Sequence, residues 1–348
     1  MRKQILLCLL IMIIFSMSAC NSGSELYKEM IKESEDYILP IEDAKEIDRK
    51  VEEDLSKFTH IYKDNYKVEK LKIDGVDNPV GILCREQDIL ITDRENDRLV
   101  VTDFEGNVIR KIGETGNGPL EFMSPGEIIR YENKVYILDE KNYRVQILDE
   151  NLNYVEEIKT KHADPNDPHF VYQNMAISKK GIYLNGFSFT SDQVHLYTAG
   201  TTEPIVIGKN FYGPLYNYQE KIYAMNTSIK TYLKKDDSLS YRGGGDNYLF
   251  LVNDEIRDFE LKCSVMSMTD TTSFLINEAG IVALSVGNAS LFTFEMDGRY
   301  TSTVAIMEGL DEEVLGISGI PNFSVSSAGD YYVTSPKNGI IFRCSPEE

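Results

Sequence analysis

Hydrophobic and polar positions alternate along short segments of this chain, and two neighbouring stretches repeat the same pattern. Residues 91–107 (ITDRENDRLVVTDFEGN) and residues 137–153 (ILDEKNYRVQILDENLN) align at a shift of 46 residues. Each copy predicts a strand, a tight polar connection, a second strand and a turn into a third strand. The pattern therefore predicts a chain built from repeated antiparallel sheets.

Repeats of about 40 to 50 residues with several short strands are typical of β-propeller blades, which bury their faces against neighbouring blades. We place the first three blades at residues 80–112, 127–158 and 171–207. The fourth joins residues 216–225 to residues 247–261 and leaves Asn226 to Asp246 as an insertion between its second and third strands. The fifth spans residues 273–306.

The last blade is predicted to close the ring with a strand from the beginning of the domain. Only three strands follow the fifth blade, within residues 323–343, so the sixth blade lacks its outer strand. Residues 66–73 (YKVEKLKI) form an unused strand before the first blade. Pairing them with the last blade removes an open sheet edge. We predict an all-β, six-bladed propeller over residues 65–348.

Residues 1–19 have the pattern of a secretory signal peptide. Two basic residues precede an apolar run that is short for a bilayer span. Ser18 and Ala19 lead into Cys20, which resembles the bacterial lipobox, where the Cys is acylated. We expect anchoring in the lipid bilayer through Cys20. Asn21, where Asp would retain the protein at the inner membrane, predicts an outer-membrane lipoprotein, periplasmic or surface-exposed. The alternative is an ordinary signal that ends near a Cys.

Between the signal and the propeller, residues 20–64 are polar, acidic and unlike the repeats. Apolar residues from Ala44 to Phe58 recur at spacings of three and four after Pro40, which predicts an amphipathic helix. We expect a lipidated tether followed by this helix, with one face of the helix resting on the propeller.

Composition narrows the classes of partner. The formal net charge is −20, so the surface repels phosphate backbones, and we expect no nucleic-acid partner. A hydrophobic content of 42% supports a sizeable core. Outside the signal and the acylation site, Cys84, Cys263 and Cys344 are scattered and odd in number, which predicts free thiols instead of a disulfide framework.

Two copies of the pattern D-x-x-N-x-R precede alternating strands, and the copies are Asp93, Asn96, Arg98 and Asp139, Asn142, Arg144. This pattern resembles the NHL repeat, and residues 66–343 resemble the six-bladed propeller lipoproteins common in Bacteroidetes. The segment GNGPLEF, from Gly116 to Phe122, is similar to the G-x-G-P-G-E-aromatic segment of that family. Leu120 replaces the Gly before the Glu, which argues against a positive φ there. The resemblance implies an exported, anchored propeller.

We interpret the repeated Asp, Asn and Arg residues as structural. An Asp at a strand end can cap the following backbone amides, an Asn tolerates a left-handed turn, and an Arg on the next strand can pair with the Asp. The alternative is that the repeated side chains form a binding ring.

Long connections are expected to gather on one face of the propeller, where recognition concentrates. These connections are Gly113 to Pro125, Thr160 to Phe170, Asn226 to Asp246 and Met307 to Pro321. Tyrosines in and around the third connection could stack on sugar rings. The ligand-binding candidates are Asn117, Glu121, Phe122, His169, Tyr232 and Arg242.

Two functions remain open. The first is a binding or scaffolding module for a glycan, a peptide or a partner protein of the envelope, without a cofactor. The alternative is a lactonase- or lyase-like enzyme with a divalent metal at the channel mouth. The resemblance to such propeller enzymes would make Asn117, Glu121, Asp164 and His169 the first candidates for its site. No familiar nucleophile or metal motif supports the alternative.

Overall fold

The computed structural model divides the chain into two compact units. The residues that it describes are 38–40, 66–160, 170–187, 192–201, 203–209, 211, 213–226, 231–235, 238–243, 247–255, 258–265, 271–286, 290–305 and 321–347. The smaller unit, from residues 1–44 and 230–243, contains one three-stranded sheet. Its strands, in spatial order, are β1 (Ile38–Pro40), β19 (Thr231–Lys235) and β20 (Ser238–Gly243).

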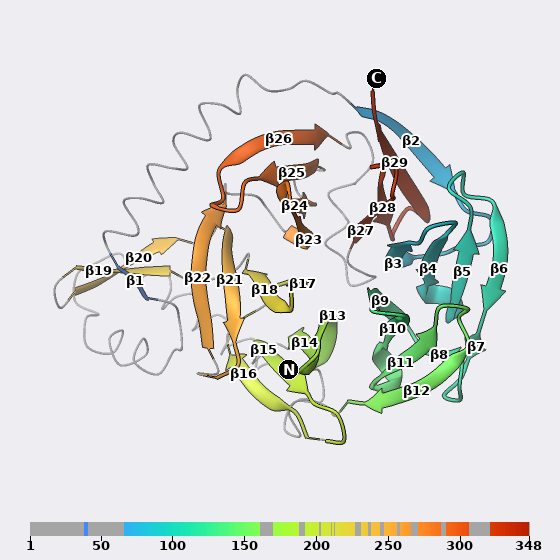
Figure 1. The fold of residues 1–348 in the computed structure, drawn as a ribbon, viewed down its shortest axis with the longest axis horizontal. Helices are drawn as coiled ribbons and strands as arrows, with labels where there is room; N and C mark the ends of the chain where they lie inside the picture. Colours follow the sequence, from blue (N-terminus) through green and yellow to red (C-terminus); the bar gives the residue numbers. More distant parts are fainter. Residues whose placement is uncertain are drawn as a thin grey trace, which may run out of the picture. The chain divides into compact units, whose positions relative to one another are not determined.

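The larger unit is a six-bladed β-propeller, which confirms the predicted fold class. Six four-stranded antiparallel sheets surround a common centre, with the first strand of each blade innermost (Figure 1). Blade one consists of β3 (Pro79–Cys84), β4 (Ile89–Asp93), β5 (Arg98–Thr102) and β6 (Val108–Ile112). Blade two consists of β9 (Pro125–Tyr131), β10 (Lys134–Asp139), β11 (Arg144–Asp149) and β12 (Tyr154–Lys159).

The remaining blades follow the same order along the chain. Blade three consists of β13 (Val171–Ser178), β14 (Gly181–Phe187), β15 (Asp192–Tyr197) and β16 (Ile205–Lys209). Blade four consists of β17 (Leu215–Tyr218), β18 (Lys221–Asn226), β21 (Asn247–Asn253) and β22 (Asp258–Val265). Blade five consists of β23 (Thr271–Asn277), β24 (Gly280–Ser285), β25 (Ser290–Phe294) and β26 (Tyr300–Ala305).

Blade six combines both ends of the propeller domain. It consists of β27 (Phe323–Val325), β28 (Tyr331–Ser335), β29 (Ile340–Pro346) and β2 (Tyr66–Lys72). The outer strand β2 pairs antiparallel with β29 along its full length, from Tyr66 opposite Pro346 to Lys72 opposite Ile340. In blade four, β18 pairs directly with β21, and the insertion between them forms β19 and β20, which pair with each other, while β19 also pairs with β1.

The core lies between neighbouring blades because successive residues of a strand point to opposite faces of its sheet. All five residues of β4 (ILITD) are buried. Leu90 packs with Ile137 of blade two, whereas Ile91 packs with Tyr332 of blade six. The second strand of blade one is therefore covered on both faces, which explains why it begins as a run of apolar residues without polar alternation.

Two expectations fall on parts of the chain that lie outside the described residues. These are the acylation site at Cys20 and the amphipathic helix from Ala44 to Phe58. Within the described part of the chain, no helix has the length and apolar character needed to cross a membrane.

Candidate functional site

One face of the propeller carries both the connections between second and third strands and the segments that precede the inner strands. After β4, the 3-10 helix η1 (Arg94–Asn96) begins, and the Arg94 amide donates to the Asn78 carbonyl just before β3, at 3.2 Å. After β10, in η2 (Glu140–Asn142), the Lys141 amide donates to the Met123 carbonyl just before β9, at 3.1 Å. We call this face the loop face.

The repeated Asp, Asn and Arg residues form a clamp on the loop face. Asp93 is fully buried, and its carboxylate accepts hydrogen bonds from Arg98 Nε (2.9 Å), Asn96 Nδ2 (2.9 Å) and the Asp77 amide (2.9 Å). Blade two repeats these contacts with Asp139, Arg144, Asn142 and the Met123 amide. Each clamp therefore fixes the second-to-third strand connection to the segment before its own inner strand.

The geometry of the clamp differs from the expected one in two details. The Asp93 carboxylate does not cap the amides that follow it, because its backbone partner is the amide 16 residues earlier in the chain. The left-handed residues are Asp97 and Tyr143, each with φ of 50°, one position after the Asn. The Asn side chain serves instead as a hydrogen-bond donor to the Asp.

The segment from Gly113 to Pro125 is held in place by blade two. Its short strands β7 (Glu114–Thr115) and β8 (Glu121–Phe122) pair in parallel. The Arg144 guanidinium donates to three of its carbonyl oxygens, those of Asn117 (2.7 Å), Gly118 (3.0 Å) and Glu121 (2.7 Å). An Arg offers five donors in a fixed fork, and here they bind these carbonyl oxygens and the carboxylates of Asp139 and Glu157.

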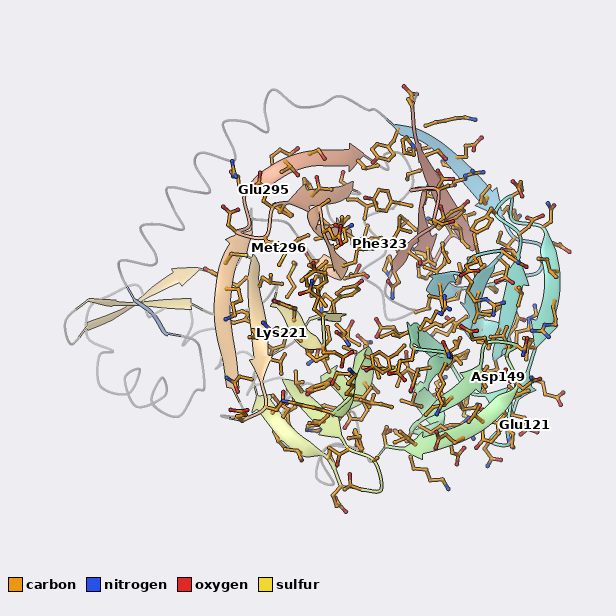
Figure 2. All side chains as sticks on the ribbon, in the orientation of Figure 1. Glu121, Asp149, Lys221, Glu295, Met296 and Phe323 are labelled. Atoms are coloured by element: carbon orange, nitrogen blue, oxygen red, sulfur yellow. The ribbon has the colours of Figure 1, made fainter. Side chains whose placement is uncertain are left out.

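Two predicted ligand contacts in this segment turn out to have structural roles. Phe122 is 0% exposed and belongs to the core between blades one and two, so it has no surface to offer a ligand. The Glu121 carboxylate accepts from the Gly118 amide at 2.8 Å, and Figure 2 shows Glu121 toward the outer side of the ring. A Cβ at Gly116 would lie 2.1 Å from that carboxylate, so a larger residue there would displace the Glu121 side chain. Asn117 remains exposed.

Leu120 corrects the expectation drawn from its replacement of a Gly. It adopts φ of 59°, so the turn keeps the left-handed geometry although the residue has a Cβ. The strain of a non-Gly residue there is of order 1 kcal/mol. Packing of the half-buried Leu120 side chain against the core between blades one and two offsets it.

The other candidate residues lie outside the described part of the propeller. Asp164 and His169 lie outside the described residues. Tyr232 falls on β19 and Arg242 on β20, which belong to the smaller unit.

The inner strands carry a feature that the sequence pattern did not reveal. In four blades the pairing of the first strand with the second is interrupted by a β-bulge near the start of the first strand. The residues at these bulges include Gly81, Glu127, Gln173 and Thr272. Bulges bend a strand and re-aim a side chain, and they are common beside functional sites.

Glu127 of the blade-two bulge forms contacts across the centre of the ring. Its carboxylate accepts a hydrogen bond from the Met175 amide of blade three and another from the side chain of Asn322, which directly precedes blade six. Asn322 Oδ1 accepts from Ser273 Oγ and from the Phe323 amide, both at 2.7 Å. Its Nδ2 is therefore the donor to Glu127. Blade one separates blades two and six, so these contacts place Glu127 near the axis (Figure 1).

This cluster lies on the loop face. Asn322 immediately precedes the inner strand β27, and Glu127 is the third residue of β9. Figure 2 shows Phe323, the residue after Asn322, toward the centre of the ring. We call Glu127, Asn322 and Ser273, together with the Met175 amide, the central cluster. Its members come from four blades, two, three, five and six.

The environment of Glu127 favours its protonated form. Loss of water around the carboxyl raises its pKa from 4.5 to about 8, although the hydrogen bonds from Met175 and Asn322 oppose this rise. Repulsion from Glu140 adds to it. Glu140 itself is held by Arg94 in a bidentate ion pair, with both N···O distances 2.6 Å. At neutral pH the central carboxyl is therefore mainly neutral.

Sequence reasoning missed Glu127 because a single Glu in the strand PGEIIRY looks like an ordinary outward-facing residue. One signal was available. Gly81, Glu127 and Gln173 are spaced by 46 residues and fall on the bulges of three successive blades. Glu127 and Gln173 are polar at the same position of the inner strand, which indicates side chains turned toward the axis.

A second polar network is buried inside blade three. Tyr172 Oη lies 2.6 Å from His195 Nδ1 and 3.0 Å from Tyr197 Oη, and His195 Nε2 lies 2.7 Å from Gln193 Oε1. Because the Gln oxygen can only accept, His195 is protonated at Nε2, and Tyr172 donates to Nδ1. Burial lowers the His195 pKa to about 4. The network is thus neutral at physiological pH.

Acidic, His and Cys side chains are the usual protein ligands of metal ions. In the part of the chain that the structure describes, no group of three or more of them is arranged to hold a metal ion.

Comparisons with known proteins agree with the fold. A family model named DUF5128 and described as a 6-bladed beta-propeller matches residues 76–242. The chain matches no curated protein.

Three solved structures illustrate the similarity. A luciferin-regenerating enzyme aligns with a TM-score of 0.55 at 10% identity, covering 80% of this chain and 95% of that one. Virginiamycin B lyase from Staphylococcus aureus with quinupristin gives 0.52 at 8% identity, covering 80% and 99%. A protein of unknown function from Bacteroides thetaiotaomicron gives 0.52 at 11% identity, covering 80% and 72%. At such identities the similarity shows the fold alone.

Proposed function

We propose that this chain is a membrane-anchored propeller of the cell envelope that binds a glycan, a peptide or a partner protein at the central cluster of its loop face. The observation that carries the proposal is the Glu127 carboxyl, which contacts blades three and six near the axis. Polar groups with a perturbed pKa that converge from several elements mark a candidate binding site.

The central cluster is fixed in advance of binding. Ser273, Asn322 and Glu127 are joined by successive hydrogen bonds, and Thr272 Oγ1 donates to the Pro321 carbonyl at 2.7 Å beside them. Groups that are already oriented lose little entropy when a ligand arrives. Rigid inner strands present them, which suits selective recognition of a polar ligand.

The test uses glycan and peptide arrays probed with the full chain in detergent. We expect ligands of at least one class, glycans or peptides, to bind the wild type. Their affinity for Glu127→Ala should be at least about tenfold lower, which corresponds to the loss of one or two hydrogen bonds at the site. Thermal melts establish that the variant is folded. Array ligands that bind both proteins equally would place recognition elsewhere and refute the proposed site.

Anchoring is proposed from the sequence around Cys20. We predict that Cys20→Ala leaves the protein without acyl chains and moves it from the detergent-extracted membrane fraction to the soluble fraction, because each buried methylene contributes about 0.8 kcal/mol to membrane attachment. Fractionation followed by immunoblotting measures this. Ser18→Ala serves as the matched control, and unchanged partitioning of Cys20→Ala would contradict anchoring.

A second candidate function is a lactonase- or lyase-like enzyme, and one observation favours it. A carboxyl that stays protonated near neutral pH is suited to donate a proton to a leaving group. Under this alternative, purified protein turns over a lactone and Glu127→Gln abolishes turnover. Metal analysis of the same preparation reports whether a divalent ion accompanies the activity.

A further inference from the structure

We propose that the central cluster recognises a positively charged amino group, the side chain of a lysine in a peptide, which Glu127 binds as a carboxylate. This inference rests on the proposed binding function and names the chemistry of its ligand.

The first argument is the missing counter-charge. A carboxylate in a partly desolvated site is stabilised by a nearby opposite charge. Among the described residues, the groups that bond to Glu127 are neutral, the Met175 amide and the Asn322 side chain. The charged group that acts on it is Glu140 of η2, which has the same sign. Arg94 of η1 bonds both oxygens of Glu140, so its charge is already matched.

The second argument comes from the repeat. Gln173 occupies the equivalent bulge in blade three, 46 residues further along the chain. A neutral amide therefore suits this position of the fold, and it can accept a hydrogen bond from a backbone amide as a carboxyl does. A Glu at this position adds the capacity to carry a negative charge when a cation arrives.

The third argument is the charge of the whole chain. A formal net charge of −20 raises the local concentration of cations and repels anions. Long-range attraction and the local carboxyl thus both favour a cationic ligand.

Binding is coupled to release of a proton. Glu127 begins as a carboxylic acid, and the lysine ammonium arrives with its own positive charge. The acid proton passes to solvent. The carboxylate and the ammonium remain as an ion pair joined by charge-assisted hydrogen bonds, which are shorter and stronger than neutral ones. Because the unliganded carboxyl titrates near pH 8, affinity should rise about tenfold from about pH 7 to about pH 9, where lysine remains charged.

The experiment measures binding of the peptide acetyl-Gly-Lys-Gly-amide to the detergent-solubilised full chain by isothermal titration calorimetry. We expect binding by the wild type and by Glu86→Gln, which removes an equal charge from an exposed position. Glu127→Gln should bind at least about tenfold more weakly, with no pH dependence in this range. The same peptide acetylated on the lysine should not bind.

Calorimetry of the wild type in buffers of different ionisation enthalpy supplies a measurement that needs no variant. About one proton should be released for each peptide bound at about pH 7. Equal binding of the charged and acetylated peptides, or charged-peptide binding without proton release, would overturn the inference. If a neutral glycan or peptide from the arrays nevertheless depends on Glu127, the proposed function stands and the cationic ligand alone fails.

Discussion

Replacing Glu127 with Gln should remove a large pH dependence from the stability of the propeller. The folded-state pKa of this carboxyl is about 8, above its ordinary value of 4.5, because burial disfavours the charged form. Between about pH 4.5 and about pH 8, the folded protein therefore keeps the proton on Glu127, whereas the unfolded chain has released it. Stability from this group is complete below about pH 4.5 and is lost as the pH rises through about 8. Gln cannot ionise and shows no such loss.

The magnitude follows from the size of the shift. Each pKa unit corresponds to about 1.4 kcal/mol, so the full range from 4.5 to about 8 sets an upper limit of about 5 kcal/mol. The side chain is half-buried, and solvent screening lowers this limit. We expect Glu127→Gln to match the wild type near pH 5 and to exceed its free energy of unfolding by about 2 to 3 kcal/mol near pH 8.

The assay is chemical denaturation followed by far-ultraviolet circular dichroism, since the chain has no Trp. The quantity of interest is the difference between variant and wild-type unfolding free energies at each pH, because groups common to both proteins cancel in it. Glu86→Gln, at an exposed position, should give a flat difference. A flat difference for Glu127→Gln as well would refute the account of a desolvated central carboxyl.

Three further predictions test other parts of the fold. The His195 pKa is lowered from 6.5 to about 4, so wild-type stability should fall relative to His195→Gln as the pH drops through this range, by up to about 1.4 kcal/mol per unit. Denaturation at several pH values measures this, and a constant difference would contradict it. Arg144→Ala should cost about 3 to 5 kcal/mol, more than Arg98→Ala, because the Arg144 side chain is 4% exposed and that of Arg98 is 21% exposed. Equal losses of unfolding free energy would count against the clamp as described. A chain beginning at residue 61 should melt cooperatively, whereas one beginning at residue 74 lacks β2 and should aggregate through the exposed edge of β29; light scattering that does not distinguish the two would disprove this role of β2.

Much of the fold could be predicted because the signals are local. Strand alternation and turn residues lie within single blades, and the repeat at 46 residues relates neighbouring blades, so the six blades follow from these signals. The Asp93 to Arg98 pair was predictable for the same reason, since the two residues face each other on adjacent strands. Its third partner, the Asp77 amide, was not, because it comes from the segment before the blade.

The candidate site was harder to predict because it depends on contacts between distant segments. Hydrogen bonds from Met175 and Asn322, which come from other parts of the ring, hold the Glu127 side chain near the axis. Phe122, an aromatic residue in a long connection, was wrongly predicted to lie in the site. It was expected to meet a ligand, but the chain turns there and inserts the ring into the core. Loop length indicates the face of a propeller on which function is expected, but it does not show which side chains point outward.

The pairing of β2 with β29 sets an order for folding. Residues 66–72 are made early, yet their partners, residues 340–346, lie at the far end of the domain. A chain that emerges amino end first can form the middle blades as they appear, but blade six cannot be completed until the last residues are free. Such distant pairing carries a high loop-closure cost and slows folding. Until then β2 lacks the strand that it pairs with in the folded protein, so an incompletely synthesised chain carries an open strand edge that can pair with other chains.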